Sequence, residues 1–284
     1  MTIITNIGEL VGIVPEGVLR KRGAEMDEVG SLKDAYLTIE GERISGFGNM
    51  SECPAAGPQD ELIDAEGGMV MPAFCDSHTH ICYAGTRERE FIDKINGLSY
   101  EEIAARGGGI LNSADLLHRT SEEELYSQTM ARVREMIAKG TGAIEIKSGY
   151  GLTTEDELKM LRVIRRVKSE SPATIKATFL GAHAVGRAFK GRQNEYVNLV
   201  CEEMIPTVAA EGLAEYVDVF CDEGFFTVSE TERILTAGER HGLIPKIHAN
   251  ELACSGGVQV AVRHNALSVD HLERTTDAEI EALR

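Results

Sequence analysis

Five of the eight histidines follow segments that read as strands, and strand ends are where parallel α/β proteins build their sites. His78 and His80 form a His-x-His pair after an apolar run, and side chains two residues apart on a strand point to the same side. Two imidazoles at this spacing can bind one divalent cation, although such a pair alone is more often found in a surface loop. His183, His248 and His271 follow later strands. Five histidines so placed favour a metal site.

A cation held by neutral imidazoles activates a water and polarises the carbonyl under attack, which suits hydrolysis at a carbon bonded to nitrogen. Proton transfer then needs a carboxylate, and Glu251 lies three residues beyond His248, although it could instead cap a helix. Arg87 follows the His-x-His pair and offers a planar guanidinium for a substrate carboxylate, although most arginines are surface charges. Tyr100 and Tyr150 could contact the same ligand or serve only for packing.

These side chains are placed by an alternation of strands and helices that begins near residue 70. Capping sequences predict helix starts near Ser121, Thr154 and Thr276. The predicted strands cover residues 70–80, 143–146, 174–180, 216–221, 244–247 and 266–269. Six βα units predict a TIM-like (β/α)8 barrel that lacks two units. An open doubly wound sheet is the alternative, but it usually has a glycine-rich loop after its first strand, and Gly107–Gly109 follow no strand.

Residues 1–68 predict a small β domain. The segments 34–39 and 43–47 both alternate apolar and polar residues around a turn at 40–42, which is typical of a hairpin. This part is too short to bury much core alone, so it should lean on the next domain or be completed by other strands. The sequence therefore predicts two domains, 1–68 and 69–284, of which the second is the barrel.

The composition excludes several classes of partner. A formal net charge of −17 with no basic patch argues against nucleic acid and anionic membranes. Six cysteines without a CxxC motif fit reduced thiols in a cytoplasmic protein. The sequence shows no apolar run long enough to span a bilayer and no N-terminal signal segment. The expected partner is a small molecule, and an anionic one would need a local cation.

Several loops taken together resemble the amidohydrolase superfamily and, within it, the imidazolonepropionase family. The matching stretches are DSHTH, AGTRERE, GGGIL, EIKSGYGL, TFLGAHAV, KIHANEL and SVDHLE. The resemblance implies a metal-dependent hydrolase barrel flanked by a small β-sandwich that both chain ends form. It also implies one zinc or iron ion, and hydrolysis of 4-imidazolone-5-propanoate to N-formimidoyl-L-glutamate in histidine degradation.

The resemblance assigns roles residue by residue. It implies His78, His80 and His248 as metal ligands. The other implied residues surround the substrate or the nucleophilic water: Arg87, Tyr100, Tyr150 and His183 for the substrate, and Glu251 and His271 for the water and the ring. The strand at 216–221 contains no lysine, which favours one ion over two, although Cys221 could bridge a pair. Barrels of this kind are often dimers, so a homodimer is also expected.

The family pattern includes a seventh strand and a metal-binding aspartate at the end of an eighth, which would lie beyond residue 284. We therefore expect a truncated form with exposed barrel edges that is weakly active or inactive alone. Two alternatives stay open. One is another mononuclear amidohydrolase or deaminase acting on a cyclic amide or nucleobase-like ring, which would not need Arg87. The other is a non-catalytic remnant that binds a metal or a partner.

Overall fold

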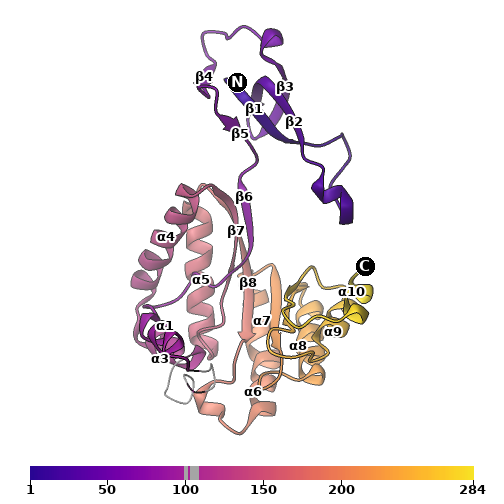
Figure 1. Ribbon diagram of the computed structural model, residues 1–284. Helices are drawn as coiled ribbons and strands as arrows, with labels where there is room; N and C mark the ends of the chain where they lie inside the picture. The colour runs from indigo at the N-terminus through magenta and orange to yellow at the C-terminus, as the bar shows by residue number, and fades with distance from the viewer. Residues whose placement is uncertain (99–101, 103–108) are drawn as a thin grey trace. The chain divides into compact units, whose positions relative to one another are not determined.

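The computed structural model describes residues 1–98, 102 and 109–284, so Tyr100 lies outside the described residues. Within this range the chain forms two compact units, Met1–Ala73 and Phe74–Arg284. Each unit has its own β-sheet and its own apolar core (Figure 1). None of the helices in the described ranges is long and apolar enough to cross a membrane.

The first unit is a five-stranded sheet. Its strands are β1 (Thr2–Ile13), β2 (Gly30–Glu40), β3 (Arg43–Asn49), β4 (Glu61–Asp64) and β5 (Met69–Val70), with the short 3-10 helices η1 (Gly23–Asp27) and η2 (Met50–Glu52). The predicted hairpin is confirmed, since β2 and β3 are antiparallel and Glu40 pairs with Arg43. Gly41, in the turn, has a φ of +60°, which glycine adopts without strain. The buried residues Ile7, Leu10, Ala35 and Leu37 form the small core.

The second unit contains a parallel sheet in the order β12-β11-β9-β8-β7-β6, with β10 beside β9. The strands are β6 (Phe74–Thr79), β7 (Thr141–Lys147), β8 (Thr174–Ala182), β9 (Tyr216–Cys221), β10 (Ile244–Pro245), β11 (Ile247–Ala249) and β12 (Val269–His271). Each new strand is added on the same side of the previous one. A doubly wound sheet would instead reverse its direction of growth at a switch point. This order confirms the incomplete barrel and excludes the open sheet.

Helices cover the outer face of the sheet (Figure 1). Those packed on the strands are α4 (Glu122–Ala138), α5 (Thr154–Glu170), the π-helix η4 (Val200–Met204), α8 (Val228–Arg240) and α9 (Gly257–Arg263). The other helices are α1 (Glu88–Ile95), α3 (Ile110–Arg119), η3 (Arg187–Phe189), α6 (Gln193–Leu199), α7 (Ile205–Ala210) and α10 (Asp277–Leu283). Their apolar faces and the outer face of the sheet form the main core, which includes Leu161, Val208 and Ile234.

Helix capping was predicted correctly at two of three positions. Ser121 caps α4 by accepting the backbone N–H of Glu124, although the full box predicted there is not formed. The helix start predicted at Thr276 is confirmed, and Thr276 forms a capping box with Glu279. The box predicted to begin at Thr154 is wrong. Thr153 caps α5 instead, which leaves Glu157 free to turn toward the preceding loop.

The strand that carries the His-x-His pair begins later than predicted. Val70 pairs with Leu10 as part of β5 and so belongs to the first unit, while the barrel strand β6 begins at Phe74. The sixth barrel strand also shifts, since β12 covers Val269–His271 rather than 266–269. The sheet nevertheless curls into a nearly closed barrel. Its first and last strands come close together, since Nδ1 of His78 on β6 lies 2.9 Å from Oδ2 of Asp270 on β12.

Candidate metal and substrate site

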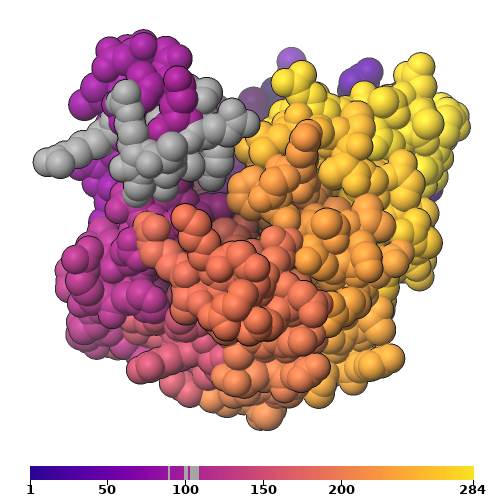
Figure 2. All heavy atoms as spheres, turned by 90° about the horizontal axis from the view of Figure 1, so that it is seen from below, coloured from indigo at the N-terminus to yellow at the C-terminus, as the bar shows by residue number. Residues whose placement is uncertain are grey.

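A cavity of about 330 Å³ opens where the barrel strands end. Figure 2 looks onto this end of the barrel, which is hollowed between the magenta and the orange residues. Every predicted site residue within the described ranges lines the cavity: His78, His80, Arg87, Tyr150, His183, His248, Glu251 and His271. Cys221, considered as a bridging ligand, does not line it.

Three imidazoles meet in this cavity. Nε2 of His80 lies 3.3 Å from Nε2 of His78 and 3.2 Å from Nε2 of His248. Nitrogen ligands about 2.0–2.1 Å from a tetrahedral ion are separated by roughly 3.3–3.4 Å, so each of these two spacings is that of a pair of nitrogens on one cation. Hydrogen bonding explains them less well, since Nε2 of His80 can donate at most one proton and so cannot satisfy both contacts.

The other ring nitrogens of two of these histidines face carboxylates. Nδ1 of His78 lies 2.9 Å from Oδ2 of Asp270, and Nδ1 of His248 lies 2.9 Å from Oδ2 of Asp218. A carboxylate beside Nδ1 favours a proton on that nitrogen and leaves the Nε2 lone pair for a metal. The sequence analysis did not assign a role to either aspartate.

Burial favours the neutral form of the imidazoles. It lowers the pKa of His80 well below its usual value, and the neighbouring His183 lowers it further. Burial also lowers the pKa of His248, although the charge of Asp218 opposes this. The pKa of His183 falls to about 3, first through burial and then through His248. Neutral imidazole is the form that binds a metal.

His271 is a second candidate for the third ligand. One nitrogen from each of His78, His248 and His271 lies within 4.8 Å of the others. We favour His80, because its Nε2 lies 3.3 and 3.2 Å from Nε2 of the two partners, whereas the ring of His271 faces Glu251 with 3.6 Å between Nε2 and Oε2. His271 has a φ of +82°, which is uncommon for a residue other than glycine and marks a constrained strand end.

Glu251 lies in the loop after β11 and lines the cavity. The carboxylate of Asp222 fixes this loop, since it accepts the backbone N–H of Glu251 at 2.8 Å and those of the next two residues at 2.9 and 3.1 Å. Glu251 belongs to no helix, and Gly256 occupies the N-cap of α9, so the helix-capping alternative is wrong. Burial raises the pKa of Glu251, although His271 opposes this, and a raised pKa suits proton transfer near neutral pH.

Arg87 precedes α1 and forms another part of the cavity wall. Its Nε donates to Oγ of Ser113 at 2.8 Å, and its guanidinium carbon lies 5.3 Å from the centroid of the Tyr150 ring. Nη2 of Arg87 is buried and has no hydrogen-bond partner among the described residues. Because an unpaired buried donor is costly, this nitrogen is available to an acceptor on a ligand.

One loop holds both Tyr150 and His183. The carbonyl oxygen of Gly149 lies 3.0 Å from Nδ1 of His183. The buried carboxylate of Glu157 accepts the backbone N–H of Gly149 at 3.0 Å and those of the two residues after Tyr150 at 2.8 and 2.9 Å. Gly149 has a φ of +108°, and an added Cβ would lie 3.0 Å from Nδ1 of His183, so glycine is required there.

Buried charges lie in the barrel interior beside the imidazoles. Nζ of Lys147 donates to Oε1 of Glu145 at 2.7 Å and to Oδ2 of Asp218 at 2.8 Å. Lys246 binds Glu145 and donates to the carbonyl oxygen of Ser77 at 2.8 Å. This network was not predicted from the sequence, although Glu145 and Lys147 occupy alternate positions of the apolar strand AIEIK and so share one face.

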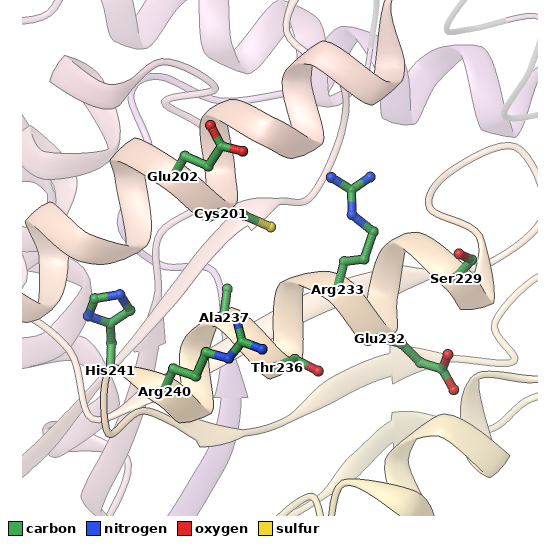
Figure 3. Close-up of a pocket in the computed structure, with 9 residues that line it drawn as sticks. All are labelled: Cys201, Glu202, Ser229, Glu232, Arg233, Thr236, Ala237, Arg240 and His241. Atoms are coloured by element: carbon green, nitrogen blue, oxygen red, sulfur yellow. The ribbon is translucent and has the colours of Figure 1, made fainter.

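A second cavity, of about 480 Å³, lies between η4 and α8 (Figure 3). It is larger, but none of the predicted site residues lines it. The guanidinium of Arg233 in this cavity is already bound by the Oδ1 atoms of Asn194 and Asn198 at 2.8 and 2.6 Å. The histidine-lined cavity is therefore the better candidate for the site.

Solved structures confirm the fold. Guanine deaminase from C. acetobutylicum aligns with 99% of this chain and 65% of its own, with a TM-score of 0.61 and 12% identity. An amidohydrolase from an environmental sample of the Sargasso Sea aligns with 99% of this chain and 61% of its own, with a TM-score of 0.60 and 15% identity. At these identities the comparison establishes the barrel fold and no more.

No family model matches the chain, but curated relatives do. The imidazolonepropionase of Christiangramia forsetii is 52% identical over 282 residues, which cover 99% of this chain and 68% of the relative. That of Flavobacterium psychrophilum is 53% identical over 283 residues, which cover 100% of this chain and 69% of the relative. The chain thus spans about two thirds of the length of these relatives. Since both identity and coverage are high, the chain belongs to the imidazolonepropionase family of amidohydrolases.

Proposed function

We propose that this chain opens the ring of 4-imidazolone-5-propanoate by hydrolysis to N-formimidoyl-L-glutamate, as the name of its relatives suggests. The observation that carries the proposal is a single cavity that contains both a cluster of three close imidazoles and a buried guanidinium nitrogen with no hydrogen-bond partner in the described part of the chain. The imidazoles suit a cation that acts on the ring. The guanidinium suits the propanoate.

We assign His78, His80 and His248 as the ligands of one divalent ion, zinc or iron, because their Nε2 spacings fit a shared cation. Such an ion, when bound, lowers the pKa of a water and polarises the ring carbonyl. Asp218 and Asp270 would keep two of the three rings in the tautomer that presents Nε2.

We assign Glu251 as the group that moves the proton. Its carboxylate faces the same cavity as the imidazoles, and burial raises its pKa toward the range in which it can accept and return a proton. In this proposal Glu251 takes the proton of the attacking water and delivers it to the ring nitrogen released when the C–N bond breaks. His271, 3.6 Å from Glu251, would orient that carboxylate and contact the ring.

The remaining wall of the cavity would bind the substrate. Arg87, oriented by Ser113, would bind the propanoate, and Tyr150 and His183 would contact the ring or its oxygen. Tyr100 is proposed for the same role from the resemblance alone. A neutral nucleobase-like ring would leave the buried donor of Arg87 unpaired, which disfavours the deaminase alternative.

Two further parts of the proposal concern the first unit and the oligomeric state. We propose that the sheet of Met1–Ala73 is the N-terminal part of a β-sandwich domain shared with other strands, since its core is small. We further propose a cytoplasmic enzyme that forms a homodimer. Size-exclusion chromatography with light scattering would test the dimer.

Direct assay tests the activity. The chain, loaded with Zn²⁺ or Fe²⁺, is incubated with 4-imidazolone-5-propanoate, and the ring-opened product is measured by mass spectrometry beside the Flavobacterium psychrophilum relative as positive control. We expect ring opening that is faster than the uncatalysed reaction but slower than with the relative, and that is lost in Glu251→Gln. Equal rates with and without the protein, or deamination of guanine in preference to ring opening, would overturn the proposal.

A further inference from the structure

Lys147 is a fully buried lysine at the end of β7, in the interior of the barrel. A buried ammonium is costly unless it is paired and hydrogen-bonded. Nζ of Lys147 has three carboxylates around it, those of Glu145 at 2.7 Å, Asp218 at 2.8 Å and Asp270 at 3.7 Å. Burial alone would lower the pKa of Lys147, but the charges of Asp218 and Glu145 outweigh it and raise the pKa. The side chain is therefore a fixed cation.

Two of these carboxylates also contact the histidines of the site. Asp218 faces Nδ1 of His248 and Asp270 faces Nδ1 of His78, each at 2.9 Å. Lys147 is thus the common partner of the two aspartates that face different imidazoles from different strands.

We propose that Lys147 is a positioning residue for the metal centre, because its hydrogen bond holds Asp218 in place behind His248, while its charge also lies 3.7 Å from Asp270 behind His78. The inference rests on the metal site of the proposed function. Lys147 contacts the aspartates and not the cavity, which makes it a residue that acts through others. Carboxylates behind ligating histidines set the orientation and basicity of the ring, and disturbing them typically costs 10–100-fold in metal affinity.

Lys246 has a different place in the same network. Its Nζ binds Glu145 and the carbonyl oxygen of Ser77, and it lies 3.6 Å from Asp270, about as close as Lys147 does at 3.7 Å. Only Lys147 binds Asp218 among the lysines of the described residues. Lys246 therefore compensates the charge of Glu145 and ties β6 to the neighbouring structure. Without Lys147, Asp218 would lose its only lysine partner among the described residues and would be free to turn away from His248.

Metal binding by the full chain tests the inference without any turnover. The affinity for Zn²⁺ is measured by competition with a chromophoric chelator, and the visible absorption of bound Co²⁺ reports the ligand geometry. We expect Lys147→Met to bind Zn²⁺ about 10- to 100-fold more weakly and to change the Co²⁺ spectrum. The matched control is Lys159→Met, which removes another mostly buried lysine that is paired with Asp156 at 2.6 Å on α5. It should bind Zn²⁺ as the unaltered chain does.

A double-variant cycle separates positioning from a general effect on stability. If Lys147 acts through Asp218, adding Lys147→Met to Asp218→Asn should weaken Zn²⁺ binding by less than twofold more. If Lys147→Met does not fold, the double variant is compared with Asp218→Asn alone. The double variant removes a buried cation and a buried anion together and so leaves no new unpaired charge between them. Additive losses, or an unchanged Zn²⁺ affinity and Co²⁺ spectrum in Lys147→Met, would overturn the inference. Absence of Zn²⁺ binding by the unaltered chain would instead overturn the proposed function on which it rests.

Discussion

Replacement of Arg87 by methionine tests whether the cavity selects an anionic substrate. The guanidinium of Arg87 is aimed by Ser113 at 2.8 Å and has a buried nitrogen, Nη2, with no partner in the described structure. Charge-assisted hydrogen bonds are worth about 1.5–3 kcal/mol each when shielded from water. Because a third of this side chain is exposed, at 33%, we take about 1.5–3 kcal/mol for the whole carboxylate contact. Arg87→Met should therefore weaken binding of a carboxylate ligand roughly 10- to 150-fold.

The assay compares two ligands that differ only in charge. Calorimetry measures the affinity of the metal-loaded chain for imidazole-4-propanoate and for the neutral imidazole-4-propanamide. Arg87→Met should weaken only the propanoate, and Ser113→Ala, which loosens the arginine, should weaken it less. Arg233→Met, in the second cavity, is the control and should change neither affinity. The prediction is refuted if Arg87→Met lowers the affinity for both ligands equally, because Arg87 would then maintain the shape of the cavity and would not bind the carboxylate.

Three further predictions concern the folded barrel. Tyr196→Phe removes a buried hydrogen bond of 2.7 Å to the carbonyl oxygen of Gly181 and should lower the free energy of unfolding by about 1–3 kcal/mol in urea titrations; an unchanged midpoint would contradict this. Gly238→Ala should destabilise by about 1–3 kcal/mol in the same assay, because the new Cβ would lie 2.5 Å from Cγ1 of Val217 and this clash exceeds the helix-propensity gain of about 1 kcal/mol; a stabilised variant would show that α8 can move. Burial raises the pKa of Cys82 to about 12, so at pH 8 this thiol should resist iodoacetamide in the native chain while exposed thiols react, as mass spectrometry would show; rapid modification of Cys82 would disprove its burial.

Local patterns were enough to find the histidines and the order of the elements. A spacing of two residues on a strand places His78 and His80 together whatever the rest of the fold does. The capping box at Thr276 likewise depends only on residues within one turn. The meeting of His248 with His80 follows from the barrel, since parallel strands bring their carboxyl ends to one face.

The bounds of the strands and the partners of Glu157 and Lys147 depend on contacts with residues elsewhere in the fold. Val70 is as apolar as Phe74, and only its pairing with Leu10 assigns it to the first unit. Glu157 has the spacing of a capping residue, but the loop before α5 offers it three backbone donors. Lys147 belongs to a residue type usually found at the surface, and its burial is tolerated only because carboxylates from other strands surround it.

The hydrogen bond from Lys246 to the carbonyl of Ser77 joins atoms whose residues are 169 positions apart. Closing so long a loop costs entropy that is repaid only after the strands in between have assembled, so this bond belongs among the last to form. The imidazoles of His80 and His248 are brought together across nearly the same span. Tight binding of a cation during refolding should therefore report the last step of folding. Intermediates that already contain helices and early strands should bind the ion as weakly as the unfolded chain does.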